Sequence, residues 1–145
     1  MAQQVFTLYN PLLLTLPNEE INFTQDTFKV MLVTSTYTPN VNTDRYKSAI
    51  TGEASGSGYE AGGQELENVQ YLRTNQTAVF TATNPKWTGL NMENVRYAVL
   101  YDDTPEQAEQ KPLIGWIDFG QALTIVNADL EIVWNVEGIF SVTLS

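Results

Sequence analysis

The amino-acid sequence predicts an all-β fold, an antiparallel β-sandwich or barrel of about eight short strands with one or two short helical turns. Three observations lead to this prediction. From residue 69 onwards, apolar and polar side chains alternate with a period of two in short runs that turn residues separate. The hydrophobic fraction is 43 %, with aromatic residues spread along the chain, which is typical of a globular domain. At 145 residues the chain is long enough for one sizeable core, so we expect a single domain, 1–145.

The N-terminal segment, residues 1–26, combines an apolar run with prolines. Asn10 followed by Pro11 is typical of a helix start in which Asn10 caps the first turn. We therefore expect one short helical turn that ends before Pro17. The segment has no basic leader, and its apolar run is shorter than the ~20 residues that span a bilayer. We expect neither a secretory signal nor a membrane span.

The run TFKVMLV, residues 27–33, is apolar on both faces, which predicts an interior strand. Residues 1–51 hold only this one good strand and could not bury a core alone. We therefore expect the strand to join the sheet that the later runs form.

The long segment 37–63 departs from any strand pattern. Thr38-Pro39-Asn40 is typical of a turn. Asn42 or Thr43 is placed to cap a short helix that runs to residue 49.

Seven further runs alternate as half-buried antiparallel strands do, at 69–73, 77–83, 95–101, 113–119, 122–126, 130–135 and 139–144. The alternation places three sets of residues each on one face, namely Val95, Tyr97, Val99 and Tyr101; Leu130, Ile132 and Trp134; and Phe140, Val142 and Leu144. Tight turns are expected at 127–129 and at Glu137-Gly138.

Residues 52–63, GEASGSGYEAGG, hold five of the nine glycines of the chain. A phosphate-binding loop needs a defined glycine spacing between a strand and a helix, and this segment has neither that spacing nor a following helix. Glu53 and Glu60 would repel a phosphate. We therefore expect the glycines to form positive-φ turns around Tyr59 in a loop that is a contact surface.

Four acidic residues gather in DDTPEQAEQK, namely Asp102, Asp103, Glu106 and Glu109. Calcium needs several converging oxygens, and the EF-hand spacing is absent, so a solvated loop is favoured and a calcium site stays the alternative. Thr104-Pro105-Glu106-Gln107 predicts a capping box on one helical turn.

Asp118 is the best candidate for acid–base chemistry, because a chain without His or Cys leaves only carboxylates for that work. It falls in step with Ile114 and Trp116, and Arg96 is its candidate partner if that face is buried. No second acid at a defined separation can be inferred. A structural ion pair is therefore favoured over catalysis.

Three tryptophans are candidates for a carbohydrate platform. Trp134 and Trp116 are in phase with core residues, so core packing is predicted for both. Trp87 lies among turn residues, where either exposure or packing fits.

Charge narrows the choice of partners. Seventeen acidic against seven basic residues give a net charge of −10, which repels phosphate, so we expect no nucleic acid and no membrane as partner. The lack of Cys fits synthesis in a reducing cytoplasm. We expect no cofactor and no bound metal.

From Tyr37 onwards the chain resembles a group of tailed-phage virion proteins. The likeness is carried by a Tyr-Thr-Pro-Asn turn, by Thr-Asp with a Tyr two residues on, and by Ser-Gly-x-Gly-Tyr-x-Ala-Gly-Gly followed by a Leu. It resumes in VRYAVLYDD, PLIGWIDFG and LEIVWNVEGIF, and thus covers nearly the whole chain. The chain departs from the group at Pro11, where relatives have what resembles a longer helix, and at NADL, where a glycine-containing turn is more usual.

The resemblance implies a non-enzymatic bacteriophage virion component, and a capsid decoration (cement) protein is the role we favour. Such a protein binds the outer surface of the major capsid protein shell and is made in the cytoplasm of the host bacterium. We expect a homo-oligomer such as a trimer. The candidate contact residues are Val5, Phe6, Leu8 and Tyr9 of the N-terminal segment and Tyr37, Tyr46 and Tyr59 of the long loop.

Other interpretations remain. Phe6 and Leu8 could simply cover one end of the barrel. The chain could be a tail or fibre-attachment component, a carbohydrate-binding module that uses Trp87, or a small glycosidase-like enzyme that uses Asp118.

Overall fold

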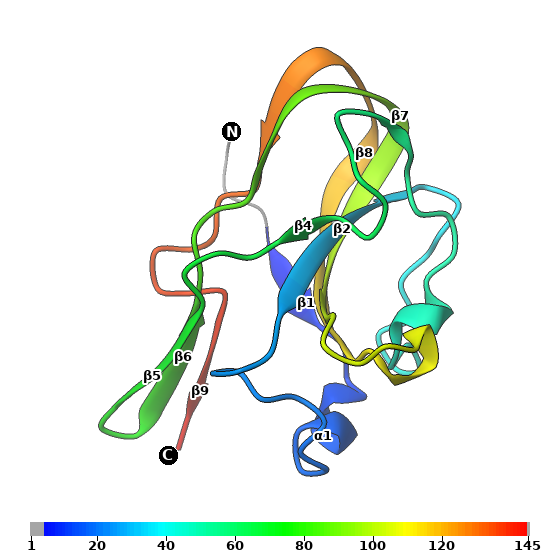
Figure 1. Cartoon of the computed structure of the whole chain (residues 1–145). Helices are drawn as coiled ribbons and strands as arrows, with labels where there is room; N and C mark the ends of the chain where they lie inside the picture. Colours follow the sequence, from blue (N-terminus) through cyan, green and yellow to red (C-terminus); the bar gives the residue numbers. More distant parts are fainter. Residues whose placement is uncertain (1–4, 145) are drawn as a thin grey trace.

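The computed structural model describes residues 5–144 and folds them into two packed antiparallel β-sheets, which confirms the predicted all-β sandwich. The larger sheet has the strand order β1-β8-β7-β2-β4, with β3 paired to β7 beyond this path, and the smaller has the order β5-β6-β9. Figure 1 shows the small sheet at the lower left, while β7 and β8 curve together over the top. The strands are β1 (Phe6–Leu8), β2 (Phe28–Thr34), β3 (Gly56–Ser57), β4 (Gln64–Glu65), β5 (Gln70–Thr74), β6 (Thr77–Thr81), β7 (Lys86–Asp102), β8 (Leu113–Glu131) and β9 (Phe140–Thr143).

Helical structure in the described residues is confined to α1 (Leu12–Thr15) and two 3-10 turns, Lys47–Ala49 and Ala108–Gln110. Within residues 5–144, none of these helices is long and apolar enough to cross a membrane. The helical turn expected before Pro17 is thus present. Its expected cap is not, because the Asn10 side chain donates to Asn42 Oδ1 at 2.8 Å instead.

Two other expected helix caps are also absent. Neither Asn42 nor Thr43 caps the 3-10 turn, because this turn begins at Lys47 with Tyr46 as its N-cap residue. The backbone N–H groups of Asn42 and Thr43 instead donate to Asn40 Oδ1 in an Asx turn. The capping box at 104–107 does not form either. Thr104 Oγ1 instead accepts from the backbone N–H of Thr27 at 2.8 Å.

The larger sheet is covered on both faces, so the interior strand expected at 27–33 is confirmed. Phe28, Val30 and Leu32 point into a core that the two sheets share, whose aromatic centre contains Phe23 and Phe80. The opposite face carries a second cluster, made of Tyr9, Met31, Val33, Tyr37, Tyr97, Val99, Tyr101 and Leu113. The N-terminal segment and the long loop supply Tyr9 and Tyr37 to this cover.

Two long strands replace four of the expected short ones. β7 runs over 17 residues and β8 over 19, so the runs 113–119 and 122–126 and the start of 130–135 all belong to β8. The tight turn expected at 127–129 is wrong. Asn127 is the extra residue of a bulge, since Asn91 pairs with Val126 and the next residue of β7, Leu90, pairs with Ala128.

The bulge at Asn127 has a local cause. Its backbone adopts a φ of 45°, and its N–H donates to Asn91 Oδ1 at 2.9 Å across the ribbon. A left-handed Asn is one of the few non-glycine residues that such a position accepts. The chain therefore continues as a strand where its composition indicates a turn.

The three predicted faces fare differently. Leu130, Ile132 and Trp134 all enter the shared core, as expected, although regular strand ends at Glu131. A register shift after Val95 places that residue in the shared core, while Tyr97, Val99 and Tyr101 lie in the second cluster. The third set, Phe140, Val142 and Leu144, does not form a buried face. Val142 and Leu144 are exposed, and only Phe140 packs against the core. The turn at Glu137-Gly138 is present, with the Gly138 N–H donating to the carbonyl of Asn135.

Candidate functional site

The glycine-rich segment lies folded onto the larger sheet. β3 pairs with β7, and Gly63 sits so close to β2 that a Cβ there would lie 1.9 Å from the Val30 carbonyl oxygen. Gly52, Gly58, Gly62 and Gly63 have positive φ angles, as the expected turns require. The segment is therefore held by close backbone packing.

Glu53 occupies the place where an anion would have to bind. Its Oε2 accepts from the Gly62 backbone N–H and from the Tyr59 hydroxyl, both at 2.6 Å. The Tyr59 oxygen in turn accepts from the Leu32 N–H of β2 at 3.0 Å. Burial and the bond to Glu53 raise the pKa of Tyr59 above its ordinary value. Tyr59 thus ties the loop to the sheet, and a carboxylate uses the amide that a phosphate would need.

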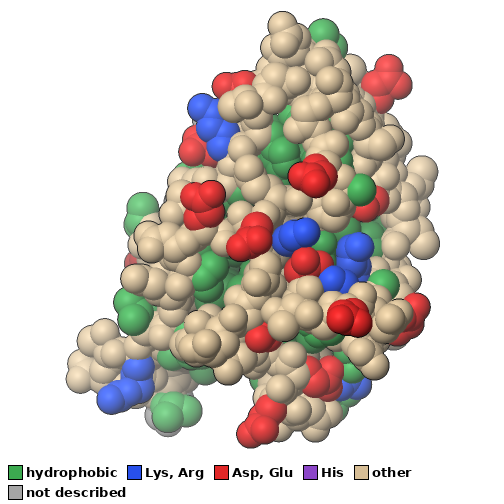
Figure 2. Space-filling model, viewed as in Figure 1, with side chains coloured by type: hydrophobic (Ala, Val, Ile, Leu, Met, Phe, Trp, Pro, Cys, Tyr) green, Lys and Arg blue, Asp and Glu red, His purple; other side chains and the backbone are tan. Residues whose placement is uncertain are grey.

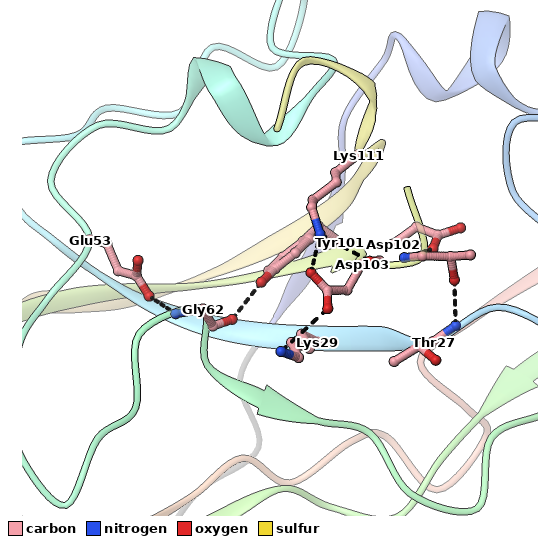
Figure 3. Close-up of polar contacts among 9 residues, drawn as sticks. Thr27, Lys29, Glu53, Gly62, Tyr101, Asp102, Asp103 and Lys111 are labelled. Carbon is pink, nitrogen blue, oxygen red and sulfur yellow. Dashed lines mark hydrogen bonds and ion pairs between the residues drawn. The ribbon is translucent and has the colours of Figure 1, made fainter. Parts of the chain in front are cut away.

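A network of polar contacts continues from this loop to the β7–β8 connection (Figure 3). The Tyr101 hydroxyl donates to the Gly62 carbonyl at 2.5 Å. Asp103 lies between Lys29, at 3.3 Å, and Lys111, at 2.5 Å. Burial alone would raise the pKa of Asp103, but the hydrogen bonds and charges of Lys111 and Lys29 lower it. Asp103 is therefore a structural anion that joins β2 to the connection.

Asp102 differs from its neighbour because it is fully buried. Its Oδ1 accepts from the Thr104 N–H at 2.9 Å, while Oδ2 has no donor within the described residues. Burial, followed by contact with the Asp26 carboxyl, raises the pKa of Asp102 to about 8. Two carboxyl groups in contact favour one shared proton. The solvated loop expected for 102–109 is thus wrong at Asp102, which points inward.

The four acidic residues of this connection do not converge. Asp102 faces Asp26, Asp103 is bound by two lysines, and Glu106 and Glu109 are exposed. Among residues 5–144 there is no group of three or more acidic side chains that could hold a metal ion. The calcium alternative therefore has no geometry in its favour.

Asp118 forms the ion pair expected with Arg96. The guanidinium Nε lies 3.1 Å from Asp118 Oδ1, on the exposed surface rather than in a buried face. The hydrogen bond from Arg96 lowers the pKa of the Asp118 carboxyl, although partial burial opposes this. A bulge at Ile114 puts Ile114 and Trp116 into different clusters, so the common face expected for Ile114, Trp116 and Asp118 does not form. Asp118 thus has a structural partner and lies outside any enclosed site.

The tryptophans pack inside the molecule. Trp134 is buried with its ring edge against Phe6, and Trp116 is half-buried against Tyr9. Trp87, for which either outcome fitted the sequence, is buried beside Tyr59. None of the three presents a free aromatic face to a sugar, which removes the basis for a carbohydrate platform on Trp87.

Of the N-terminal candidate contact residues, Val5 is the exposed one, with 81 % of its surface accessible. Phe6 and Leu8 are half-buried and pack against the shared core, so they do cover one margin of the sandwich. Tyr9 is only 1 % accessible, and its hydroxyl lies 2.7 Å from that of Tyr37. As folded, Tyr9 offers no surface to a partner.

The long-loop candidates are also engaged within the chain. Tyr37 is buried, and its hydroxyl donates to Asp44 at 2.7 Å. Tyr46 is half-buried and donates to Glu20 at 2.6 Å. Glu20 also accepts from Arg45 at 2.7 Å, a contact that the sequence pattern did not suggest because its partners are 25 residues apart. These tyrosines therefore fasten the loop and the N-terminal segment to one another.

Sequence reasoning missed the exposed apolar segment near the C-terminus. Val136, Val142 and Leu144 are exposed there, beside a groove of about 390 Å³ between β1 and β9. Strict alternation assigned two of them to the core. The signal that could have found them is the lack of any charged residue from 138 onwards in an otherwise acidic chain.

Comparison with known proteins found no matching family model, no matching curated protein and no matching solved structure.

Proposed function

We propose that the chain is a non-enzymatic structural protein of a tailed-phage virion. Its role is that of a capsid decoration protein, which binds the outer surface of the major capsid protein shell and stabilises it. The supporting observation is the structural role, within this fold, of the segment that carries the resemblance. In Ser-Gly-x-Gly-Tyr-x-Ala-Gly-Gly, Gly56 and Gly58 pack against β7 and Gly63 packs against β2, while Tyr59 and Gly62 bind Glu53. The motif therefore stabilises the fold and holds the loop, with its outer surface, against the sheet.

The acidic side chains that invite chemistry have structural partners. Glu53 is bound by Tyr59 and Gly62, Asp103 by two lysines, and Asp118 by Arg96. A catalytic carboxylate needs an open position beside the reacting atoms, which these partners occupy. This supports a structural role over the glycosidase-like alternative.

The surface charge supports a location outside the shell. Figure 2 shows acidic side chains scattered over the visible face, with fewer basic ones among them. A net charge of −10 repels packaged DNA and keeps free copies apart. A specific contact with the shell then has to be made through uncharged side chains or basic groups of the partner.

Co-sedimentation with expanded capsids from which decoration proteins have been stripped tests this proposal. We expect saturable binding at modest salt, with a fixed number of copies per capsid subunit. Electron microscopy of the decorated shells then has to place new density on their outer surface. Failure to bind would overturn the decoration role, and density on tails of complete virions would assign the chain to the tail or fibre attachment.

A further inference from the structure

The two sheets expose their unpaired edges on the same side of the sandwich. β1 ends the larger sheet and β9 ends the smaller one (Figure 1). The groove of about 390 Å³ is lined by Phe6 of β1 and the preceding Val5, by Phe140 and Ser141 of β9, and by Trp134. One side of the molecule therefore combines two open strand edges with a groove that both apolar and polar groups line.

These two edges lack the protection that the other two edges carry. β4 contains Glu65 and β5 contains Arg73, whereas β1 and β9 contain no charged residue. Charged residues on an edge strand are a common defence against pairing with another strand. In a chain with a net charge of −10, two neutral edges on one side mark a surface made for pairing.

The backbone of β9 has hydrogen-bonding groups directed away from its neighbour. The Leu144 N–H donates to the Gln76 carbonyl of the β6 side, and Phe80 pairs with Phe140 in the same register. In an antiparallel ladder the bonded residues alternate, so the backbone groups of Ser141 and Thr143 point to the open side. Within residues 5–144 no backbone bond to these two residues on that side is present.

Apolar side chains surround this edge. Val5 and Val136 are highly exposed, and Val142 and Leu144 follow along β9 itself. Within residues 5–144, Glu137 is the one charged residue that lines the groove. Exposed apolar side chains along an unpaired edge strand favour pairing with another chain.

We propose that β9 pairs antiparallel with β9 of a second copy of this chain, so that the two small sheets form one continuous sheet across a twofold axis. A twofold pairing sets the strand against itself, so a charge near the axis would lie beside the same charge of the second copy. The neutral β9 meets this requirement, and β5, with Arg73, does not. A partner of opposite charge would be drawn to the acidic surface instead, whereas a second acidic copy approaches best through the neutral side.

The experiment measures the mass of the purified chain by sedimentation velocity, from low micromolar to a few hundred micromolar, without capsids. We expect twice the 16.2 kDa of one chain at the higher concentrations. Val142→Lys introduces two like charges at the twofold axis and should weaken the dimer by about 100-fold or more. Because capsids are absent, this result is separate from the test of the decoration role.

Leu72→Lys is the matched control. Leu72 lies on β5, the other edge of the same sheet, and is 57 % exposed against 46 % for Val142. The control should dimerise as the unaltered chain does. A second variant, Ser141→Pro, removes one outward N–H without adding a charge, and proline is tolerated on an edge that faces solvent.

Far-UV circular dichroism checks that each variant is folded. If Val142→Lys does not fold, Ser141→Pro decides: a monomeric Ser141→Pro variant supports the proposal, and a dimeric one overturns it. The proposal is also overturned if the unaltered chain is monomeric throughout, if it is a trimer, or if Val142→Lys and Leu72→Lys change its mass equally.

Discussion

Single side chains join parts of this protein that are distant in sequence. Glu20 holds Tyr46 and Arg45, Glu53 holds Tyr59, and Asp103 holds two lysines. Each carboxylate is partly withdrawn from water, and each is compensated by donors from another segment. Asp102 is the exception, since its compensation is a proton in contact with Asp26.

This exception predicts how stability depends on pH. The folded-state pKa of Asp102 is raised to about 8, so the folded chain binds this proton more tightly than the unfolded chain does. The contribution of this proton to the free energy of unfolding is fully present below the ordinary pKa of an aspartate, near pH 4. It is lost as pH rises through about 8. The urea midpoint should therefore fall between pH 5 and pH 8.5. Urea titrations at several pH values measure this.

Asp102→Asn mimics the protonated carboxyl and should flatten the pH dependence in this range. Asp118→Asn is the control, because Arg96 lowers the pKa of Asp118. The contribution of the Asp118 carboxylate to the free energy of unfolding is therefore present above the ordinary pKa of an aspartate and is lost only as pH falls below it. This control should keep the original slope between pH 5 and pH 8.5. An Asp102→Asn variant with an unchanged slope would refute the shared-proton interpretation.

At the scale of elements, the short strand β4 depends on one close approach to β2. Gly63, directly before β4, has a φ of 90° and leaves no room for a Cβ beside the Val30 carbonyl. Gly120 in β8 has a similar φ of 88°, but a Cβ there would meet nothing within 4 Å. The two glycines thus share a conformation and differ only in packing.

Substituting alanine at each position separates these two effects. Gly120→Ala should lower the free energy of unfolding by about 1–2 kcal/mol, because alanine is strained at this positive φ. Gly63→Ala adds a clash with the backbone of β2, so that β4 has to move away from β2. It should lower the free energy of unfolding by about 3 kcal/mol or more. Urea denaturation of both variants measures the difference. Equal losses would mean that β4 adjusts without cost.

At the scale of the molecule, the exposed apolar side chains lie in separate places. α1 carries Leu13, which is 76 % exposed, and β8 carries Val126, which is 71 % exposed. In Figure 1, α1 lies at the opposite end from the arch of β7 and β8. If the N-terminal segment contacts the capsid, as expected from the sequence, these two residues should differ in their effect on shell binding.

Leu13→Lys should therefore weaken binding to stripped capsids by about 10-fold or more, since it removes an apolar contact and adds a charge to it. Val126→Lys, a matched change at the far end, should bind as the unaltered chain does. Co-sedimentation at fixed salt compares them. The reverse order would place the contact at the β7–β8 end.

Much of the fold could be predicted from the sequence by itself. The alternation of TAVFT and of the run around Val99 determines strands, and the two-sided TFKVMLV determines an interior strand, because strand periodicity is a local property. The Arg96–Asp118 pair was expected for a buried face, whereas the structure forms it on the exposed surface. The length of β7 and β8 was not predictable, since their bulges at Asn94 and Asn127 place turn-forming residues inside strands.

Only the tertiary structure decided which side chains are available to a partner. Tyr9 and Tyr37 looked suited to contact and are buried, and Trp87, for which either outcome fitted, is buried as well. Val142 and Leu144 looked like core and are exposed. The physical reason is that exposure depends on what another segment places over a side chain. The long loop covers Tyr9, whereas β9 ends the small sheet with one side unpaired. Local periodicity determines the strands, and the packing of distant segments determines the surface.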